Sequence, residues 1–278
     1  MDPNEVQRDY WNGPGGQRWV THQDLLDRMV RPFGLAALAQ LNLRPGERVL
    51  DVGCGCGETL IEIAQAVGPG GSVVGVDLSA PMLQRARQRG VKAELIVGDA
   101  AAQRFDRPFD ALFSRFGVMF FADAVAAFTR LHATLAAQGR IGFVCWREPG
   151  KNLWMSVPMV AVKKAVPELA PPPPASPTEP GPFAFADRSY LERVLRDAGF
   201  TRPDIVPFDT EIELSSTGLE DAVEFVLTAT PISRLVATAS DAQRERAAVA
   251  LREALAPRFQ GDRLALGAAA WLVLAHAG

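Results

Sequence analysis

Short apolar runs alternate with amphipathic stretches between residues 47 and 146. An apolar run bounded by turn residues is typical of a strand that is buried on both faces, and apolar positions three or four apart are typical of a helix. Strands that alternate with helices form a parallel sheet with helices on both sides. We therefore expect an α/β fold with a Rossmann-like, doubly wound sheet. The expected strands are 47–53, 72–77, 92–97, 109–115 and 140–146.

The helices between these strands have recognisable ends. The first is expected over residues 57–67. Ser79 is a good N-cap for the second, which Gly90 closes, and Asp123 caps the helix before the last of these strands. Residues 46–146 are therefore expected to form the core of the fold.

The chain before the core is expected to form a helical cap segment, residues 1–45. Pro32 and Gly34 predict a break in its helix, which then resumes to Leu41. Its apolar residues at helical spacing are Leu25, Leu26, Met29, Val30 and Phe33.

The pattern changes after residue 146. Prolines from 171 to 182 predict a semi-rigid surface connection. The other expected elements are a helix 154–166, a helix from Asp187 to Gly199, a strand 204–214, two or three helices within 218–258 and a final strand 264–275.

Two segments in this second half are expected to be insertions. We interpret residues 147–186 and a helical insertion, 216–260, as lids that fold over the carboxyl edge of the sheet. Residues 187–278 otherwise form the remainder of the core. The alternative is that the insertions are only packing outgrowths.

A glycine-rich turn, Gly53-Cys54-Gly55-Cys56-Gly57, follows the first strand. Glycine lets a backbone turn sharply and approach a ligand closely, and the helix that follows presents free N–H groups to an anion. The second strand ends in Asp77, about twenty residues past the last glycine, and its carboxylate can accept hydrogen bonds from ribose hydroxyls. These features predict a nucleotide-type site. The dinucleotide fingerprint is incomplete, because Glu58 stands where its third glycine belongs.

The sequence D-x-G-x-G-x-G from Asp51 resembles motif I of class I S-adenosylmethionine (SAM)-dependent methyltransferases. It is similar to the small-molecule branch that contains the ubiquinone and menaquinone C-methyltransferases. The resemblance implies SAM as cofactor, S-adenosylhomocysteine as product, in-line methyl transfer, and an antiparallel pair of last strands at one edge of the sheet. The later segments that carry the resemblance are Asp77-Leu78-Ser79, Gly98-Asp99-Ala100, 109–116 and 135–146.

The resemblance also implies the cofactor residues. Asp51 would hold the amino group of SAM, Asp77 the ribose, and Asp99 the adenine amino group. Met82 is as often a core residue, and Asp99 can instead cap the next turn. The full implied set is Asp51, Gly53, Cys54, Gly55, Asp77, Leu78, Met82, Asp99, Ala100 and Ser114.

The segment from Tyr10 to Trp19 has aromatic residues around a group of glycines. We expect a glycine hinge that closes over SAM, with Tyr10 and Trp19 on the cofactor; a hydrophobic staple is the alternative. His22 is a candidate general base, although a lone histidine is more often structural. Arg115 is the second catalytic candidate, and an ion pair is its alternative.

Aromatic and sulfur-containing side chains are candidates for the lining of a pocket that binds a flat or lipophilic acceptor. Several of them must belong to the core instead. They are Phe116, Met119, Trp146, Trp154 and Phe183.

Composition excludes several other classes. A net charge of −3 without a basic stripe, and Ser114-Arg115-Phe116 where amino-methylating nucleic-acid enzymes of this fold carry two prolines, argue against a nucleic-acid partner. No apolar run is long enough for a membrane span, and the polar start is no signal peptide. Three cysteines are expected to be reduced thiols in a cytoplasmic protein, and no metal site is expected.

The leading interpretation is a SAM-dependent methyltransferase acting on a small, aromatic or lipophilic molecule. One alternative is a SAM-binding protein that does not methylate, such as a lyase or a partner protein. A nicotinamide oxidoreductase is a more distant one. The acceptor, the methylated atom and the oligomeric state stay open.

Overall fold

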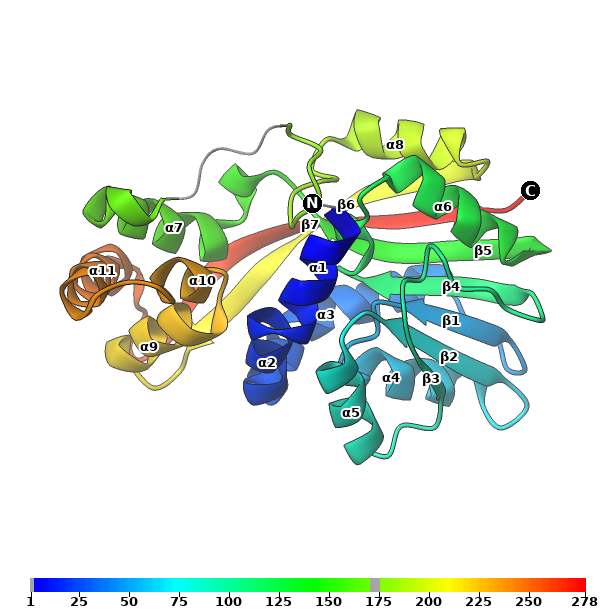
Figure 1. Ribbon diagram of the computed structural model, residues 1–278, viewed down its shortest axis with the longest axis horizontal. Coiled ribbons are helices and arrows are strands. Elements are labelled where there is room, and N and C mark those ends of the chain that lie inside the picture. The colour runs from blue at the N-terminus through cyan, green and yellow to red at the C-terminus, as the bar shows by residue number, and fades with distance from the viewer. Residues whose placement is uncertain (1–2, 171–175) are drawn as a thin grey trace. The chain divides into compact units, whose positions relative to one another are not determined.

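A computed structural model describes residues 3–170 and 176–278. The strands form one sheet in the order β3-β2-β1-β4-β5-β7-β6 (Figure 1). The predicted strands are present, but β5 begins earlier than expected because Leu135 pairs with Phe109 before the register shifts. The bounds are β1 (Arg48–Val52), β2 (Ser72–Asp77), β3 (Glu94–Val97), β4 (Phe109–Arg115), β5 (Leu135–Trp146), β6 (Thr201–Ser215) and β7 (Leu264–His276).

Most of the sheet is parallel. β1 pairs with β2 and β4, β2 with β3, and β4 with β5, all in parallel. β7 runs antiparallel to β5, with Arg140 opposite His276 and Trp146 opposite Ala270. The predicted Rossmann-like sheet with an antiparallel last strand is therefore confirmed. Because parallel strands end at one edge, the residues that follow β1, β2 and β4 come together there.

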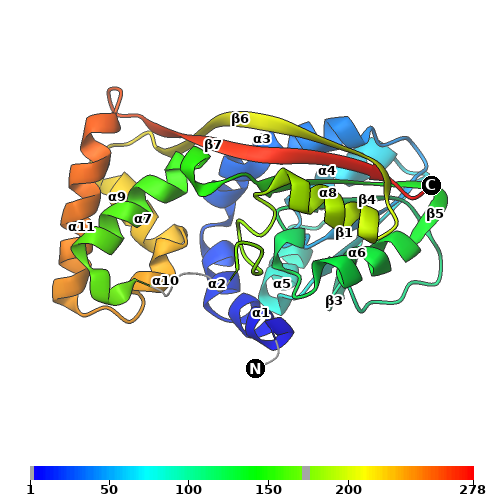
Figure 2. The same ribbon diagram turned by 90° about the horizontal axis from the view of Figure 1, so that it is seen from above.

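Helices cover both faces of this sheet. Figure 2 shows α3 and α4 on one face and α6 and α8 on the other. The predicted caps form: Ser79 accepts from the Met82 N–H at 3.3 Å, and Asp123 accepts from Ala126 at 2.9 Å. The helices are α3 (Gln23–Leu41), α4 (Glu58–Val67), α5 (Ala80–Gln88), α6 (Ala124–Ala133) and α8 (Arg188–Asp197).

Helix α3 continues through Pro32, so the predicted break at Pro32 and Gly34 is wrong. A proline removes one backbone donor, but the apolar face of α3 is buried along most of its length, and this burial outweighs the loss. Gly34 instead provides space: a Cβ there would lie 2.9 Å from Cδ of Arg115.

Gly15 and Gly16 lie within a helix rather than in an open hinge. Helix α1 (Pro3–Asn12) is followed by α2 (Pro14–Thr21), with Gly13 between them. Gly16 is buried, and a Cβ on it would lie 2.1 Å from the Trp11 carbonyl oxygen and 2.7 Å from the Ser79 hydroxyl. These glycines therefore allow close packing, which sequence spacing does not reveal.

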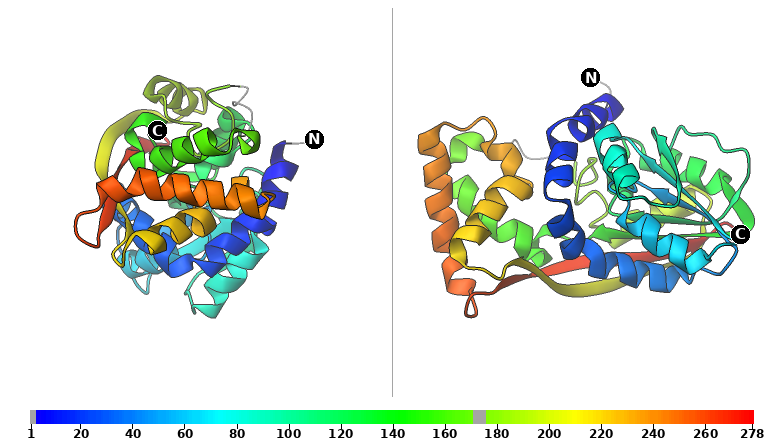
Figure 3. Two further views of the ribbon diagram at one scale, coloured as in Figure 1. Left: turned by 90° about the vertical axis from the view of Figure 1, so that its left-hand side faces the viewer. Right: turned by 90° about the horizontal axis from the view of Figure 1, so that it is seen from below.

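The chain divides into two compact units. The first is Met1–Arg147, Pro177–Phe208 and Ala270–Gly278, and the second is Glu148–Ser176 and Asp209–Ala269. The helices of the second unit, α7 (Leu153–Ala165), α9 (Leu219–Ala229), α10 (Ile232–Val236) and α11 (Asp241–Leu255), are seen in Figure 3, and α11 packs on α7 and α9.

Short 3-10 turns complete the described chain. They are η1 (Val118–Phe120), η2 (Pro149–Lys151), η3 (Pro167–Leu169) and η4 (Ala256–Arg258). The predicted proline connection begins at residues 171–174, which lie outside the described residues. Residues 177–186, expected in the lid segment, group with the first unit. The lid function of both insertions stays a prediction.

Candidate cofactor and active site

The glycine turn after β1 brings two backbone segments into direct contact. Gly53 has a φ of +71°, and a Cβ there would lie 2.9 Å from Cα of Gly117. A Cβ on Gly117 would in turn lie 2.7 Å from the Val52 carbonyl oxygen. Since these distances leave no room for a side chain, both positions require glycine. Gly53 was predicted from its motif; Gly117 was missed, because its partner is distant in sequence.

Met82 lies against the same turn. Its Cε would be 2.8 Å from a Cβ on Gly55, and the side chain is buried. Cys54 is buried in the turn as well. The structure therefore brings the predicted residues Gly53, Cys54, Gly55 and Met82 together at the carboxyl edge of the sheet.

Asp77 accepts two backbone hydrogen bonds. Its Oδ2 accepts from Gly55 N–H and its Oδ1 from Ser79 N–H, both at 2.8 Å. Burial raises the pKa of Asp77 above its ordinary value, and the two hydrogen bonds oppose that shift. Each carboxylate oxygen has a second lone pair, so the group can still accept from two hydroxyls.

Asp51 is fully buried at the end of β1. The Thr59 hydroxyl donates to its Oδ2, whereas its Oδ1 has no hydrogen-bond partner among the residues described. Burial raises the pKa of Asp51 to about 7; Thr59 and Arg115 oppose that shift, while Asp77 and Glu62 add to it. A buried carboxylate oxygen without a donor is costly, so this atom is suited to receive a cationic or N–H group.

The end of β4 is tied to the end of β1. The Ser114 hydroxyl is buried, donates to the Val52 carbonyl at 2.7 Å and accepts from Gly117 N–H at 3.2 Å. Its hydroxyl proton is therefore used within the protein. Ser114 was expected to reach the methionine end of the cofactor, which stays a prediction; in this structure its hydroxyl fixes the backbone beside the glycine turn.

Phe116 follows with an unusual backbone. Its φ is +61°, a region that bulky residues rarely occupy. Its ring stacks on Trp146 with centroids 3.9 Å apart and an interplanar angle of 15°, and Phe33 contacts both rings edge-on. This aromatic stack of Phe33, Phe116 and Trp146 lies within the first unit.

The other predicted pocket residues are not all gathered there. Met119 is buried, and its Sδ lies 3.4 Å from the Trp146 backbone nitrogen, so it packs as core. Phe183 is half-buried in the first unit. Trp154 is buried in the second unit.

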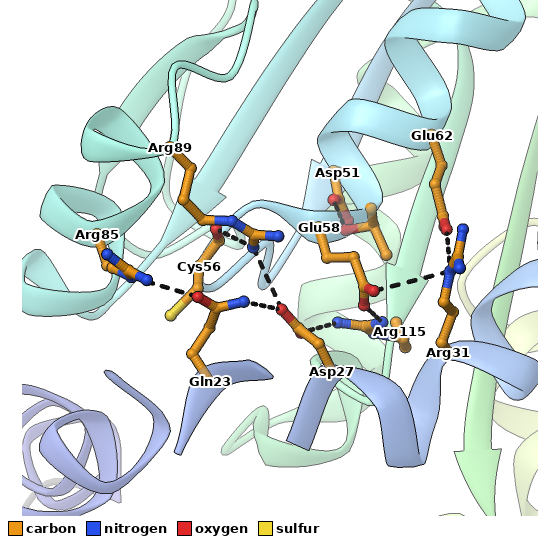
Figure 4. Close-up of polar contacts among 11 residues, drawn as sticks. Gln23, Asp27, Arg31, Asp51, Cys56, Glu58, Glu62, Arg85, Arg89 and Arg115 are labelled. Atoms are coloured by element: carbon orange, nitrogen blue, oxygen red, sulfur yellow. Dashed lines mark hydrogen bonds and ion pairs between the residues drawn. The ribbon is translucent and has the colours of Figure 1, made fainter. Parts of the chain in front are cut away.

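Arg115 lies in a network of charged groups near the turn (Figure 4). Its Nη2 is 2.9 Å from Oδ1 of Asp27, and its Nη1 pairs with Glu58. Burial lowers the pKa of Arg115, but these two carboxylates outweigh burial and raise it above its ordinary value. The guanidinium is thus a permanent, paired cation. Asp27 was not predicted, since nothing along α3 marks it as facing β4.

The network continues to the glycine turn. Arg89 donates to Oδ2 of Asp27 at 3.2 Å and to the Cys56 carbonyl at 2.9 Å. Gln23 donates to the same Asp27 oxygen at 2.6 Å. These contacts connect α3 to the turn and to the end of β4.

The N-terminal helices also reach this edge. The Asn12 side chain donates to the Leu78 carbonyl at 2.9 Å and accepts from Ala80 N–H at 3.0 Å, which fixes the loop after Asp77. Tyr10 and Trp19 are half-buried on these helices. Sequence reasoning missed Asn12, because a polar residue near a terminus carries no signal of a distant backbone partner.

The remaining predicted residues are Asp99, Ala100 and His22. Asp99 is half-buried and accepts from Ala101 N–H at 2.9 Å, as in its capping alternative, next to buried Ala100. His22 lies at the junction of α2 and α3 and is half-buried.

All three cysteines are free and buried. Burial raises the pKa of Cys56 to about 12 and also raises those of Cys54 and Cys145. They are therefore protonated thiols at neutral pH. Over residues 3–170 and 176–278, no group of three or more His, Cys, Asp or Glu side chains is arranged to hold a metal.

Residues 49–139 match a family described as a methyltransferase domain. Nocamycin O-methyltransferase of Saccharothrix syringae is 31% identical over 198 residues, which cover 67% of this chain and 70% of that protein. The chain belongs to the SAM-dependent methyltransferase family. A demethylmenaquinone methyltransferase of Staphylococcus epidermidis is 28% identical over 59% of this chain and 71% of its own length.

Solved structures share the fold of this methyltransferase. A phosphoethanolamine N-methyltransferase of Haemonchus contortus, solved with S-adenosyl-L-methionine, superposes with a TM-score of 0.57 at 18% identity. It covers 97% of this chain and 59% of that one. At this identity the likeness supports the fold alone.

The residues at the carboxyl edge fit SAM, the cofactor of this family. Oδ1 of Asp51, which has no partner within the described part of the chain, suits an ammonium group, and Asp77 has free lone pairs for two hydroxyls. The close approach of Gly53 and Gly117 leaves the turn without side chains that would block a ligand. Among the helices of the described residues, none has the length and apolarity to cross a membrane.

Proposed function

We propose that this methyltransferase acts on a small, aromatic or lipophilic acceptor. The observation that carries the proposal is the stack of Phe116 on Trp146, held by a strained backbone near the glycine turn. Strained residues cluster at binding sites, and an aromatic platform favours a flat acceptor. The names of the two relatives, a nocamycin and a demethylmenaquinone methyltransferase, support a small organic acceptor.

The chain's residues would hold and orient the cofactor. SAM supplies a methyl group already activated on a sulfonium. Asp51 would accept from its amino group and Asp77 from the ribose hydroxyls, with Leu78 and Met82 beside the adenine and Asp99 at the adenine amino group. Gly53 and Gly55 let the backbone approach. Holding donor and acceptor in line can supply roughly 7–11 kcal/mol of the barrier.

A proton acceptor is needed only if the methyl acceptor retains its proton at neutral pH. Arg115 is unsuited to that task, because its guanidinium is paired with Asp27 and Glu58 and stays charged. His22 stays our candidate for a general base. A phenol, with a pKa near 10, would need such a base, whereas an activated carbon acceptor would not.

We also propose a reducing compartment, the cytoplasm, for this protein. The three buried thiols are unpaired, as is usual where disulfides do not persist. The net charge of −3 supports a small-molecule acceptor over a nucleic acid.

The test measures cofactor binding and turnover. Titration calorimetry of the protein with SAM should give a heat of binding, and incubation with phenols, quinols and amines should release S-adenosylhomocysteine. Binding without release from any acceptor would favour a SAM-binding protein that does not methylate. No binding would reject the proposal.

Asp77→Ala should weaken SAM binding by about 10- to 100-fold, because it removes hydrogen bonds from hydroxyls to a charged acceptor. Asp110→Ala is the matched control: that carboxylate also accepts a backbone N–H, from Arg48 at 2.8 Å, but lies at the start of β4. If both variants bind SAM equally well, Asp77 is not a cofactor ligand.

A further inference from the structure

Arg115 is a buried cation that forms ion pairs with residues of two helices. Only 10% of its side chain is exposed, and its partners Asp27 of α3 and Glu58 of α4 are 6% and 14% exposed. Buried ion pairs often contribute little net stability, because desolvation offsets their attraction. An arrangement of this kind therefore calls for a role beyond stability.

Asp27 connects Arg115 to the cofactor turn. The same carboxylate that binds Arg115 also receives Arg89, whose second contact is the Cys56 carbonyl within the turn. Glu58 is the first residue of α4, directly after the turn. Arg115 thus sets the position of α3 and α4 around the segment that would hold SAM.

Arg115 also acts electrostatically on Asp51. The groups that act on the charge of this buried carboxylate are the Thr59 hydroxyl, which donates to it, the cation Arg115, and the carboxylates of Asp77 and Glu62. The buried Cys54 thiol, which also interacts with Asp51, stays protonated and adds no charge. Two negative charges and burial favour its neutral form, and Arg115 opposes them. Without Arg115, a proton on Asp51 would compete with the ammonium group of the cofactor.

We propose that Arg115 is a positioning residue for cofactor binding, whose buried charge, aligned by Asp27 and Glu58, favours the ionised form of Asp51. The inference rests on the proposed function, in which Asp51 accepts from the cofactor's amino group. It replaces a direct catalytic role for Arg115 with an indirect one.

The experiment compares Arg115→Met with Arg140→Met in the full chain. Arg140 is a matched buried arginine: it pairs with Glu47 at 2.9 Å and donates to the Leu41 carbonyl at 2.7 Å, so it anchors the other end of α3. Both variants should melt at lower temperature. Only Arg115→Met should change how SAM binding depends on pH.

The readout is the ratio of variant to wild-type Kd for SAM between pH 6 and pH 9, in which the ligand's own titration cancels. Losing a nearby cation raises a carboxyl pKa by roughly one unit or more. From a starting pKa of about 7, the Arg115→Met ratio should be about 10 at pH 6 and near 1 at pH 9. Arg115→Lys, which keeps the charge, should stay closer to wild type at pH 6.

Asp27→Asn gives an independent result if Arg115→Met does not fold. The substitution removes the negative charge that partly cancels the charge of Arg115, but it keeps an oxygen that can accept from the guanidinium. Because Asp51 should then ionise at lower pH, tight SAM binding should extend to lower pH. The inference would be overturned if the Kd ratio of Arg115→Met did not change with pH and matched that of Arg140→Met. It would also be overturned if tight SAM binding by Asp27→Asn moved to higher pH. Wild-type protein that binds no SAM at any pH would instead reject the proposed function.

Discussion

Two carboxylates at the carboxyl edge have opposite surroundings, and this decides what each can do. Asp77 receives two backbone N–H groups, which favour its charged form. Asp51 is more deeply buried and has one oxygen without a partner among the described residues. The ionised form of Asp51 therefore destabilises the cofactor-free protein, and a bound cation can offset that cost.

Asp51→Asn should stabilise the cofactor-free protein at pH 8. The pKa of Asp51 is raised from 3.8 to about 7 in the folded state, so the folded protein holds this proton more tightly than the unfolded chain. The stability from that proton is present below pH 4 and lost as pH rises toward 7. Melting temperatures of both proteins from pH 4 to pH 8 check this: the wild type should fall relative to the variant.

The same variant should lose most of the stabilisation that SAM gives the wild type. A ligand at a hundred times its Kd contributes about 2.7 kcal/mol. Asp110→Asn, at an exposed carboxylate, should leave both the pH dependence and the SAM effect unchanged. An Asp51→Asn protein that SAM stabilises like wild type would contradict the assignment of Asp51.

At the scale of elements, the site depends on how closely β1 and β4 end beside each other. The two strands pair in parallel, and their following turns touch at Gly53 and Gly117. The Ser114 hydroxyl connects both backbones. The position of the glycine turn is thus fixed by β4 as much as by its own sequence.

Gly117→Ala should separate these turns, because the new Cβ would lie 2.7 Å from the Val52 carbonyl oxygen. Overpacking of this kind costs about 1–3 kcal/mol. We expect a lower melting temperature and at least tenfold weaker SAM binding by calorimetry. Gly70→Ala is the control, since its nearest atom would be 3.9 Å away. Equal SAM binding by the two variants would show that the contact does not shape the site.

At the scale of the whole molecule, the cofactor residues and the aromatic stack belong to one compact unit. The helices α7, α9, α10 and α11 of the second unit contain Trp154, which the sequence predicts for the acceptor pocket, and none of the residues proposed for the cofactor. We therefore predict that the second unit serves the acceptor and takes no part in cofactor binding, as the lid interpretation of the insertions requires.

Hydrogen exchange with mass spectrometry should separate these two roles. SAM alone should slow exchange of backbone amides in residues 53–57, 78–82 and 99–102, the segments proposed to hold the cofactor. Helices α7, α9 and α11 should respond only when an acceptor is added with S-adenosylhomocysteine. Asp77→Ala protein provides the control for the first effect. Unchanged exchange in these helices with an acceptor that is turned over would reject the lid.

The order of strands and helices along the chain, the glycine turn and the acidic residue at the end of β2 could all be predicted from the sequence. Each depends on local information: an apolar run, a cap, or a glycine that must adopt a positive φ. The caps at Ser79 and Asp123 formed as expected for the same reason.

Other features were decided only by the tertiary structure. Helix α3 passes through Pro32 because its buried face outweighs one lost hydrogen bond, and Gly34 makes room for Arg115. The partners of Arg115, the contact of Gly117 and the bonds of Asn12 join residues far apart in sequence. The sequence by itself determined which residues follow each strand, because periodicity and capping act over a few residues. Which of them pair, and which carboxylate oxygen is left without a partner, was decided when the strands came together, because distance and burial exist only in the folded chain.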